Sequence, residues 1–221
     1  MRPRIDLRLN AIIDPARAGG HDLVDLARRV AAGGATLVQL RDKRSETRAI
    51  VDAARAIKAA LKPLHVPFVV NDRVDVALAV EADGAHLGPD DMAAEDARAL
   101  LGPEAIIGLS IKTIDEAEAA PVELIDYAGI GGVYATTSKE QNSAPIGPAG
   151  LAKIIDVLRR RAGELPLCGI AGIDAGNAGA VIAAGADGIA VISALSLTPD
   201  PAAAAVSLRR IVDAMLAKRG T

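Results

Sequence analysis

One stretch of the sequence combines glycines, hydroxyl side chains and a lysine within residues 131–139, which read GGVYATTSK. The glycines allow close approach of the backbone, and the hydroxyl groups can donate hydrogen bonds to phosphate oxygens. Lys139 adds a positive charge on a flexible stem. The stretch alone also fits a solvated turn, so we interpret it as a phosphate-binding loop only together with the residues that follow.

A group of cationic and amide residues follows an apolar run in the segment VQLRDK. Gln39, Arg41 and Lys43 alternate along the chain, so their side chains point the same way if the backbone stays extended. A solvated strand end is one interpretation. Two cations and an amide on one face also indicate a site for an anion.

Carboxylates follow the next two apolar runs, with Asp72 in VVND and Asp91 in HLGPDD. Either aspartate could simply cap a helix. A carboxylate from each of two neighbouring strand ends, facing an anion site, also suits Mg²⁺, which takes one or two protein carboxylates together with water and phosphate oxygens. His86 has no partner at zinc-site spacing, so we interpret it as a structural residue or as a hydrogen-bond donor to the site.

Short apolar runs alternate with segments of helical periodicity along the chain. The predicted strands are residues 7–13, 36–40, 67–70, 85–87, 105–109, 124–130, 165–170 and 188–192. The predicted helices are residues 22–32, 46–61, 74–82, 93–101, 114–120, 151–162, 178–184 and 201–217. Eight such units without a linker predict a (β/α)₈ TIM barrel, a single catalytic domain over residues 1–221.

Functional residues of such a barrel lie at the carboxyl ends of its strands, which groups the polar residues into two anion pockets. The first pocket, over strands two to five, is rich in cations and carboxylates and suits a diphosphate with Mg²⁺. The second, over strands six to eight, offers hydroxyl and backbone N–H groups and suits a single phosphate ester.

Composition excludes several classes of function. The net charge is −3 and the charges are mixed along the chain, so nucleic-acid binding has no electrostatic support. No run of about 18 uncharged apolar residues occurs, so we expect no membrane span, and the N-terminus does not read as a signal peptide. Cys168 is the one cysteine, which fits a cytoplasmic protein without disulfides. The sequence leaves a homo-oligomer open.

The motifs VQLRDK, VVND, HLGPDD, GLS, GGVYATTSK, CGIAGI and VISAL stand in this order in the chain. In order and in spacing they resemble thiamine-phosphate synthase, from about residue 7 to about residue 195. The resemblance implies a barrel that joins two small phosphorylated substrates, an aminopyrimidine methyl diphosphate and a thiazole ethyl phosphate. The products would be thiamine phosphate and pyrophosphate.

The resemblance also assigns residues to each substrate. The pyrimidine diphosphate would be bound by Gln39, Arg41, Lys43, Asn71, Ser110 and Lys139. The thiazole phosphate would be bound by Thr136, Thr137, Ser138, Gly172, Ile192 and Ser193. Asp72 and Asp91 resemble the family's Mg²⁺ ligands, and the residues assigned to catalysis are Arg41, Lys43, Ser110 and Lys139. The family mechanism is dissociative: the diphosphate leaves first, and the thiazole nitrogen captures the pyrimidine methylene cation.

Three departures from the family pattern stand near these residues. Pro89 replaces a common Gln, Asp42 replaces a common Glu, and Ile111-Lys112 replace a common Thr-His. The missing histidine argues against the related thiazole tautomerase.

Two other functions stay open at this point. A non-catalytic binding barrel of the tautomerase-like branch would not need the metal and diphosphate residues. A different phosphate-binding barrel enzyme would need an acid–base pair at the barrel mouth.

Replacement of Lys139 tests the dissociative interpretation. If Lys139 lies where charge develops as the diphosphate departs, Lys139→Ala should lower kcat by much more than it raises KM. Steady-state release of pyrophosphate measures both constants. An unchanged kcat would remove this role.

Overall fold

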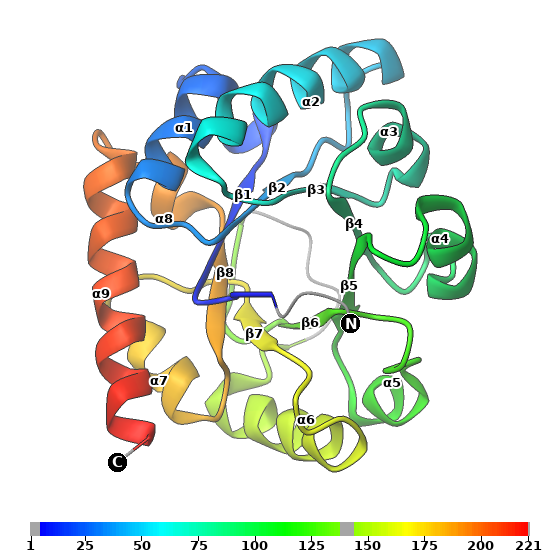
Figure 1. Cartoon of the computed structure of the whole chain (residues 1–221). Coiled ribbons are helices and arrows are strands. Elements are labelled where there is room, and N and C mark those ends of the chain that lie inside the picture. The colour runs from blue at the N-terminus through cyan, green and yellow to red at the C-terminus, as the bar shows by residue number, and fades with distance from the viewer. Residues whose placement is uncertain (1–4, 138–143, 221) are drawn as a thin grey trace.

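The computed structural model describes residues 5–137 and 144–220, and its eight strands form a closed barrel in chain order. The strands are β1 (Leu9–Ile13), β2 (Leu37–Leu40), β3 (Phe68–Asn71), β4 (Gly84–Leu87), β5 (Ile106–Ile111), β6 (Tyr127–Gly131), β7 (Leu167–Ile170) and β8 (Gly188–Val191). Every neighbouring pair is parallel, and β8 pairs with β1 to close the ring. The predicted (β/α)₈ barrel is confirmed (Figure 1).

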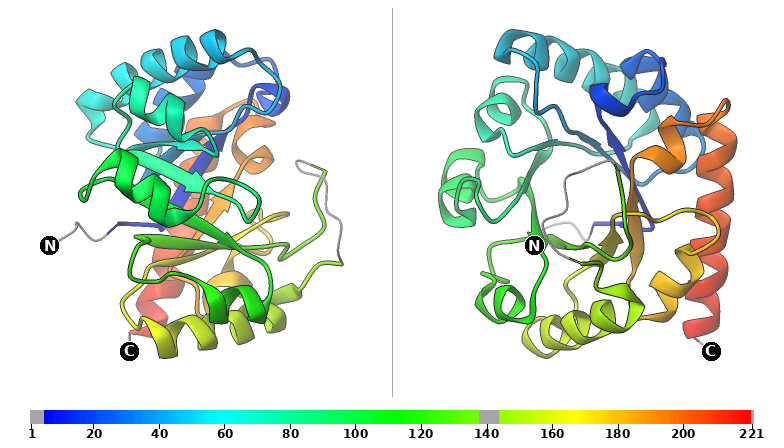
Figure 2. Two further views of the ribbon diagram at one scale, coloured as in Figure 1. Left: turned by 90° about the vertical axis from the view of Figure 1, so that its right-hand side faces the viewer. Right: turned by 180° about the vertical axis from the view of Figure 1, so that it is seen from behind.

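Helices surround the ring of strands, as the side and rear views show (Figure 2). The long ones are α1 (Leu23–Ala32), α2 (Thr47–Leu61), α4 (Ala94–Leu101), α6 (Gly147–Arg161) and α9 (Pro201–Arg219). The short ones are α3 (Val74–Ala79), α5 (Ile114–Ala119), α7 (Ala178–Ala183), α8 (Ser193–Ser196), η1 (Pro15–Arg17) and η2 (Lys62–Leu64). Among the described residues, no helix has the length and apolar character to cross a membrane.

The strands are buried on both faces because helices cover the outside and side chains fill the inside. The inside is a separate apolar cluster formed by Ile5, Leu7, Ile12, Leu37, Val69, Ile106, Tyr127, Cys168 and Ala190. Backbones and side chains approach closely in this barrel, because a Cβ on Gly84 would lie 1.8 Å from the Ile106 carbonyl oxygen. A Cβ on Gly108 would lie 2.1 Å from the Tyr127 ring. Small inward residues therefore allow one large ring, that of Tyr127, inside a narrow barrel.

Most element boundaries lie within two residues of the predicted ones, but α3 ends at Ala79 rather than at residue 82, and two elements start three or more residues away from the predicted position. β6 begins at Tyr127 rather than at residue 124, because Leu124 closes a turn onto the Pro121 carbonyl and Asp126 accepts a hydrogen bond from Ile107 N. α6 begins at Gly147 rather than at residue 151, with a proline in its first turn, where the missing N–H costs nothing. Apolar periodicity indicates neither the turn before β6 nor the proline in the first turn of α6.

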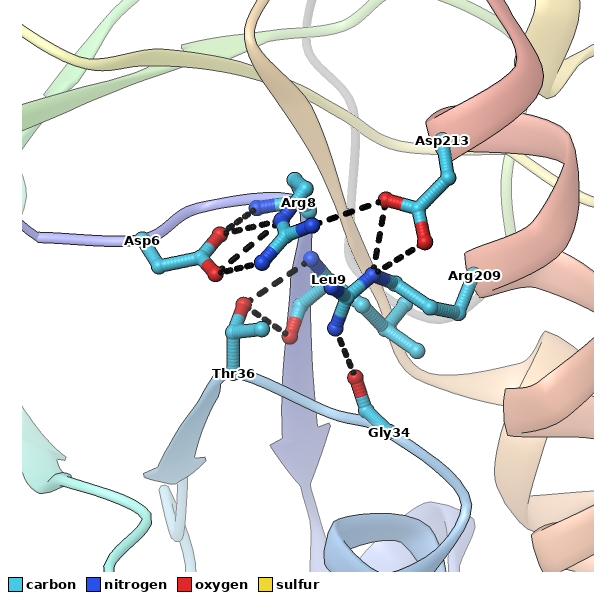
Figure 3. A network of polar contacts seen from close by, with 7 residues as sticks. All are labelled: Asp6, Arg8, Leu9, Gly34, Thr36, Arg209 and Asp213. Carbon is cyan, nitrogen blue, oxygen red and sulfur yellow. Dashed lines mark hydrogen bonds and ion pairs between the residues drawn. The ribbon is translucent and has the colours of Figure 1, made fainter. Parts of the chain in front are cut away.

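A polar network ties the last helix to the first strand at the amino ends of the strands (Figure 3). Arg8 lies between Asp6 and Asp213 and donates to the Asp213 carboxylate over 3.1 Å. Arg209 also binds Asp213 and donates to the Gly34 carbonyl oxygen over 3.0 Å. Burial opposes ionisation of Asp6, but the hydrogen bonds and charge of Arg8 outweigh it and lower the pKa of Asp6. This face of a barrel serves stability, because the site chemistry gathers at the opposite rim.

Cys168 tests the packing of the barrel interior. Its thiol is fully buried, and burial raises its pKa to about 12. The thiolate fraction near pH 8 is then on the order of 1,000-fold smaller than for an exposed cysteine. We expect a thiol reagent at pH 8 to leave the folded protein unlabelled and to label it fully in strong denaturant. Rapid labelling of the folded chain would contradict a sealed interior.

Candidate active site at the carboxyl ends of the strands

Arg41 is held between the ends of β1 and β2. Its backbone N–H donates to the Ile13 carbonyl oxygen over 2.8 Å, which continues the pairing of the two strands by one residue. Its guanidinium donates to Asp14 Oδ2 over 2.5 Å. The Arg41 side chain is 15% exposed and the Asp14 side chain 4%, so this ion pair is largely shielded from solvent.

Lys43 pairs with the other strand next to β2: it forms an ion pair with Asp72, which follows the end of β3. β2 ends at Leu40, so the extended backbone does not continue to Lys43. The condition for a shared direction of Gln39, Arg41 and Lys43 is therefore not met beyond Leu40, and the two cations pair with different neighbours, Arg41 with Asp14 and Lys43 with Asp72. Because 47% of the Lys43 side chain is exposed, its ammonium group stays within reach of a ligand.

The two predicted metal ligands lie at neighbouring strand ends. Asp72 adopts a left-handed conformation (φ 62°) directly after β3, and its N–H donates to the His86 carbonyl oxygen of β4 over 2.8 Å. Asp91 folds back over the end of β4, where its Oδ2 accepts from Gly88 N over 2.7 Å. Two carboxylates and no soft ligand fit Mg²⁺ with water and phosphate oxygens as its other partners. In residues 5–137 and 144–220, no three His, Cys, Asp or Glu side chains gather into a closed metal site.

A buried chain of polar side chains runs from the barrel interior to the rim. Tyr127 OH lies 2.9 Å from His86 Nδ1, and His86 Nε2 lies 2.9 Å from Ser110 Oγ. Gln39 is hydrogen-bonded to Tyr127. Burial raises the pKa of Tyr127 well above its usual value, so the phenol stays neutral. His86 is thus a hydrogen-bond partner of Ser110, which agrees with its predicted structural role.

Asn71 completes this part of the rim. It is the last residue of β3 and stands beside His86 in the strand register. The structure therefore brings six predicted residues to the ends of β2–β5: Gln39, Arg41, Lys43, Asn71, Asp72 and Ser110. Asp91 adds a carboxylate to the loop after β4.

A hollow of about 480 Å³ lies beyond the ends of β6–β8. It is lined by Ala135, Thr136, Thr137, Gly172, Ile173, Asp174, Ser193 and Ala194. Four of the predicted thiazole phosphate residues are in this lining. A fifth, Ile192, packs against the interior cluster just before α8. Ser138 and Lys139 lie outside the described residues.

The loops after β6 and β7 lie against each other. Val133 N donates to the Ile170 carbonyl oxygen, and Tyr134 N donates to the Ala171 carbonyl oxygen, each over 3.1 Å. A Cβ on Gly172 (φ 65°) would lie 2.4 Å from the carbonyl oxygen of the opposite loop, so only glycine fits there. The two loops thereby form one wall of the hollow.

Three residues of this region escape the sequence interpretation. Asp14 follows β1 directly, and the strand-end rule applied to the first strand would have found it. Tyr127 lies inside an apolar strand, where no local pattern marks its phenol as part of a network. Arg17 lies in η1 and donates to the carbonyl oxygen of Thr137, a residue of the loop after β6 that is far from Arg17 in the sequence.

Comparisons with known proteins agree on one family. A family model described as thiamine monophosphate synthase matches residues 9–195. The thiamine-phosphate synthase of Agrobacterium fabrum (strain C58) is 47% identical over 216 residues, which cover 98% of each chain. The Moorella thermoacetica protein of the same name is 48% identical over 204 residues, covering 92% of this chain and 95% of that one.

A solved structure extends the likeness to three dimensions. The thiamine phosphate pyrophosphorylase of Pyrococcus furiosus superposes with a TM-score of 0.84 at 38% identity, covering 96% of this chain and 98% of that one. Fold and sequence thus agree with those of this relative over nearly the full length. The chain belongs to the thiamine-phosphate synthase family, transferases of thiamine biosynthesis.

Proposed function

We propose that the two parts of the rim bind the two substrates of the family reaction, and that residues 1–221 act as one catalytic domain. The observation that carries this proposal is the separation of chemistry around the ring. Ion-paired cations gather at the ends of β2–β4, whereas the lining of the hollow beyond β6–β8 includes three hydroxyl side chains, small apolar residues and a single charged residue, Asp174. A diphosphate carries more negative charge than a single phosphate ester, so the part of the rim with more cations suits the diphosphate.

The pyrimidine diphosphate would lie over β2–β5. Arg41 and Lys43 approach this region from β2, each already oriented by a carboxylate, and Lys43 can leave Asp72 for a phosphate oxygen. Ser110 is oriented by His86 and can donate its hydroxyl proton to the substrate, while the amides of Gln39 and Asn71 can bind the polar edge of the pyrimidine. Lys139 would contribute from the loop after β6.

Asp72 and Asp91 would hold Mg²⁺. When bound, the metal ion would stabilise the negative charge on the oxygens of the departing diphosphate. The protein residues would stabilise the same charge. Arg41 would offer a fixed cation and Lys43 a movable one where the leaving group accumulates its negative charge, in a rim where Arg41 is mostly shielded from water. The reaction then needs no protein nucleophile, in agreement with the burial of Cys168.

The thiazole phosphate would be anchored in the hollow beyond β6–β8. Thr136, Thr137 and Ser193 offer hydroxyl groups, and the first N–H groups of α8 have no partner within the helix. Anchoring the phosphate leaves the thiazole ring free to face the centre of the rim. Its nitrogen can then attack the methylene carbon of the pyrimidine as the bond to the diphosphate oxygen breaks.

A cytoplasmic location suits this reaction because both substrates carry phosphates, which do not cross an apolar membrane interior.

Metal dependence tests the assignment of the diphosphate region. With both substrates and Mg²⁺, we expect release of one pyrophosphate for each thiamine phosphate formed, and no release when either substrate is omitted or EDTA is added. Asp72→Asn and Asp91→Asn should each lower kcat/KM by about 100-fold or more, because each removes a charged oxygen ligand. The exposed control Asp52→Asn, on α2, should behave as wild type. Full activity in EDTA would contradict the metal assignment.

The hollow makes a separate prediction. Thr136→Val keeps the size of the side chain and removes its hydroxyl, so KM for the thiazole phosphate should rise by about tenfold, the usual effect of losing one hydrogen bond to a charged group. KM for the pyrimidine diphosphate should change less than twofold. Thr36→Val, at the opposite end of the barrel, is the matched control. Equal changes in both KM values for Thr136→Val would contradict two separate pockets.

A further inference from the structure

We propose that Asp14 is a positioning residue that holds the guanidinium of Arg41 in the orientation in which it meets the substrate diphosphate. This inference rests on the proposed role of Arg41. It adds the residue that follows β1 to a site otherwise built from the ends of β2–β8.

Both oxygens of the Asp14 carboxylate are occupied. Oδ1 accepts from Ala16 N over 2.9 Å and caps η1, while Oδ2 accepts from the Arg41 guanidinium over 2.5 Å. The residue is 3% exposed. A buried carboxylate needs a partner of opposite charge, and within the described residues Arg41 is the cation bound to it.

Arg41 is therefore fixed at two points. Its backbone is fixed by the hydrogen bond to Ile13, the last residue of β1. Its guanidinium is fixed by Asp14, which directly follows β1. A free arginine side chain would lose considerable rotamer freedom on binding an anion. Here the side chain has lost that freedom before the substrate arrives, and the guanidinium, with five N–H donors, keeps donors for a phosphate.

The same two residue types pair differently elsewhere in the chain. Asp200 caps α9 and accepts from Arg29 over 3.0 Å, so it combines a cap and an arginine pair as Asp14 does. Its side chain is 60% exposed and that of Arg29 is 29% exposed. Solvent therefore competes for that pair, which lies in the helical layer, and it serves as a matched control.

Asn is the informative replacement at Asp14. An amide has the shape of a carboxylate but offers one acceptor oxygen and one NH₂ donor. Both partners of Asp14 are N–H donors, so the amide can satisfy the η1 cap or Arg41 but not both. In either orientation the amide lacks the negative charge that holds the guanidinium, so Asp14→Asn loosens Arg41 with little change in volume.

Four variants test the inference: Asp14→Asn, Arg41→Met, the double variant and Asp200→Asn. We expect Asp14→Asn to lower kcat/KM for the pyrimidine diphosphate by about 10- to 100-fold, as expected when a charged group is misplaced, with KM for the thiazole phosphate changed less than twofold. In the Arg41→Met background, Asp14→Asn should cause no further loss, because Asp14 acts through Arg41. Asp200→Asn should leave both constants as in the wild type.

The thermal midpoint gives a readout independent of activity. Arg41→Met leaves the Asp14 carboxylate buried without a cation, so it should lower Tm, and adding Asp14→Asn should recover part of that loss. A Tm of the double variant at or below that of Arg41→Met would contradict the pairing of Asp14 with Arg41 in the folded chain.

Unchanged activity of Arg41→Met would remove the proposed role of Arg41 and this inference with it. A large loss for Arg41→Met, together with wild-type activity of Asp14→Asn, would overturn the inference alone. Losses that multiply in the double variant would also overturn it, because Asp14 would then act independently of Arg41.

Discussion

The pairing of β8 with β1 is the constraint on which the arrangement of this site depends. Hydrogen bonding of Leu9–Ala11 against Ile189–Val191 closes the sheet into a ring. In a closed ring of parallel strands, every carboxyl end meets at one rim, so side chains from all parts of the sequence come within reach of one ligand. The network of Arg8, Asp213 and Arg209 at the opposite end ties the last helix to the first strand and supports this closure.

Charge at the rim is compensated before any ligand binds. Arg41 is paired with Asp14 and Lys43 with Asp72, so neither cation stands alone in a partly shielded site. The two pairs differ in solvent access, because Lys43 is 47% exposed and Arg41 is 15% exposed. An exposed pair exchanges partners at low cost, whereas a shielded pair holds its geometry. Under the proposed function, Lys43 would follow the diphosphate while Arg41 stays in place.

The interior of the barrel contributes to function through its packing. Small inward residues leave room for the Tyr127 ring, and Tyr127 in turn binds His86, which binds Ser110 at the rim. Because each donor and acceptor in this chain is satisfied by the next, the Ser110 hydroxyl is oriented from below. The hollow beyond β6–β8 is built differently, from a wall of two loops whose close contact requires Gly172. The two parts of the rim thus rely on different physical supports.

Apolar periodicity was sufficient to predict eight strand–helix units, and the strand-end rule was sufficient to place Gln39, Asn71, Ser110 and the carboxylates at one rim. Both signals are local, because each depends on residues a few positions apart. The directions of Arg41 and Lys43 were decided by contacts with neighbouring strand ends, and the start of β6 at Tyr127 by a turn at residues 121–124 and by the contact of Asp126 with β5. Arg41 finds Asp14 at a separation of 27 residues, and His86 finds Tyr127 at 41. The sequence by itself determined which chemical groups stand at the strand ends, whereas only the tertiary structure decided which group pairs with which, because closure of the ring makes distant strand ends into neighbours.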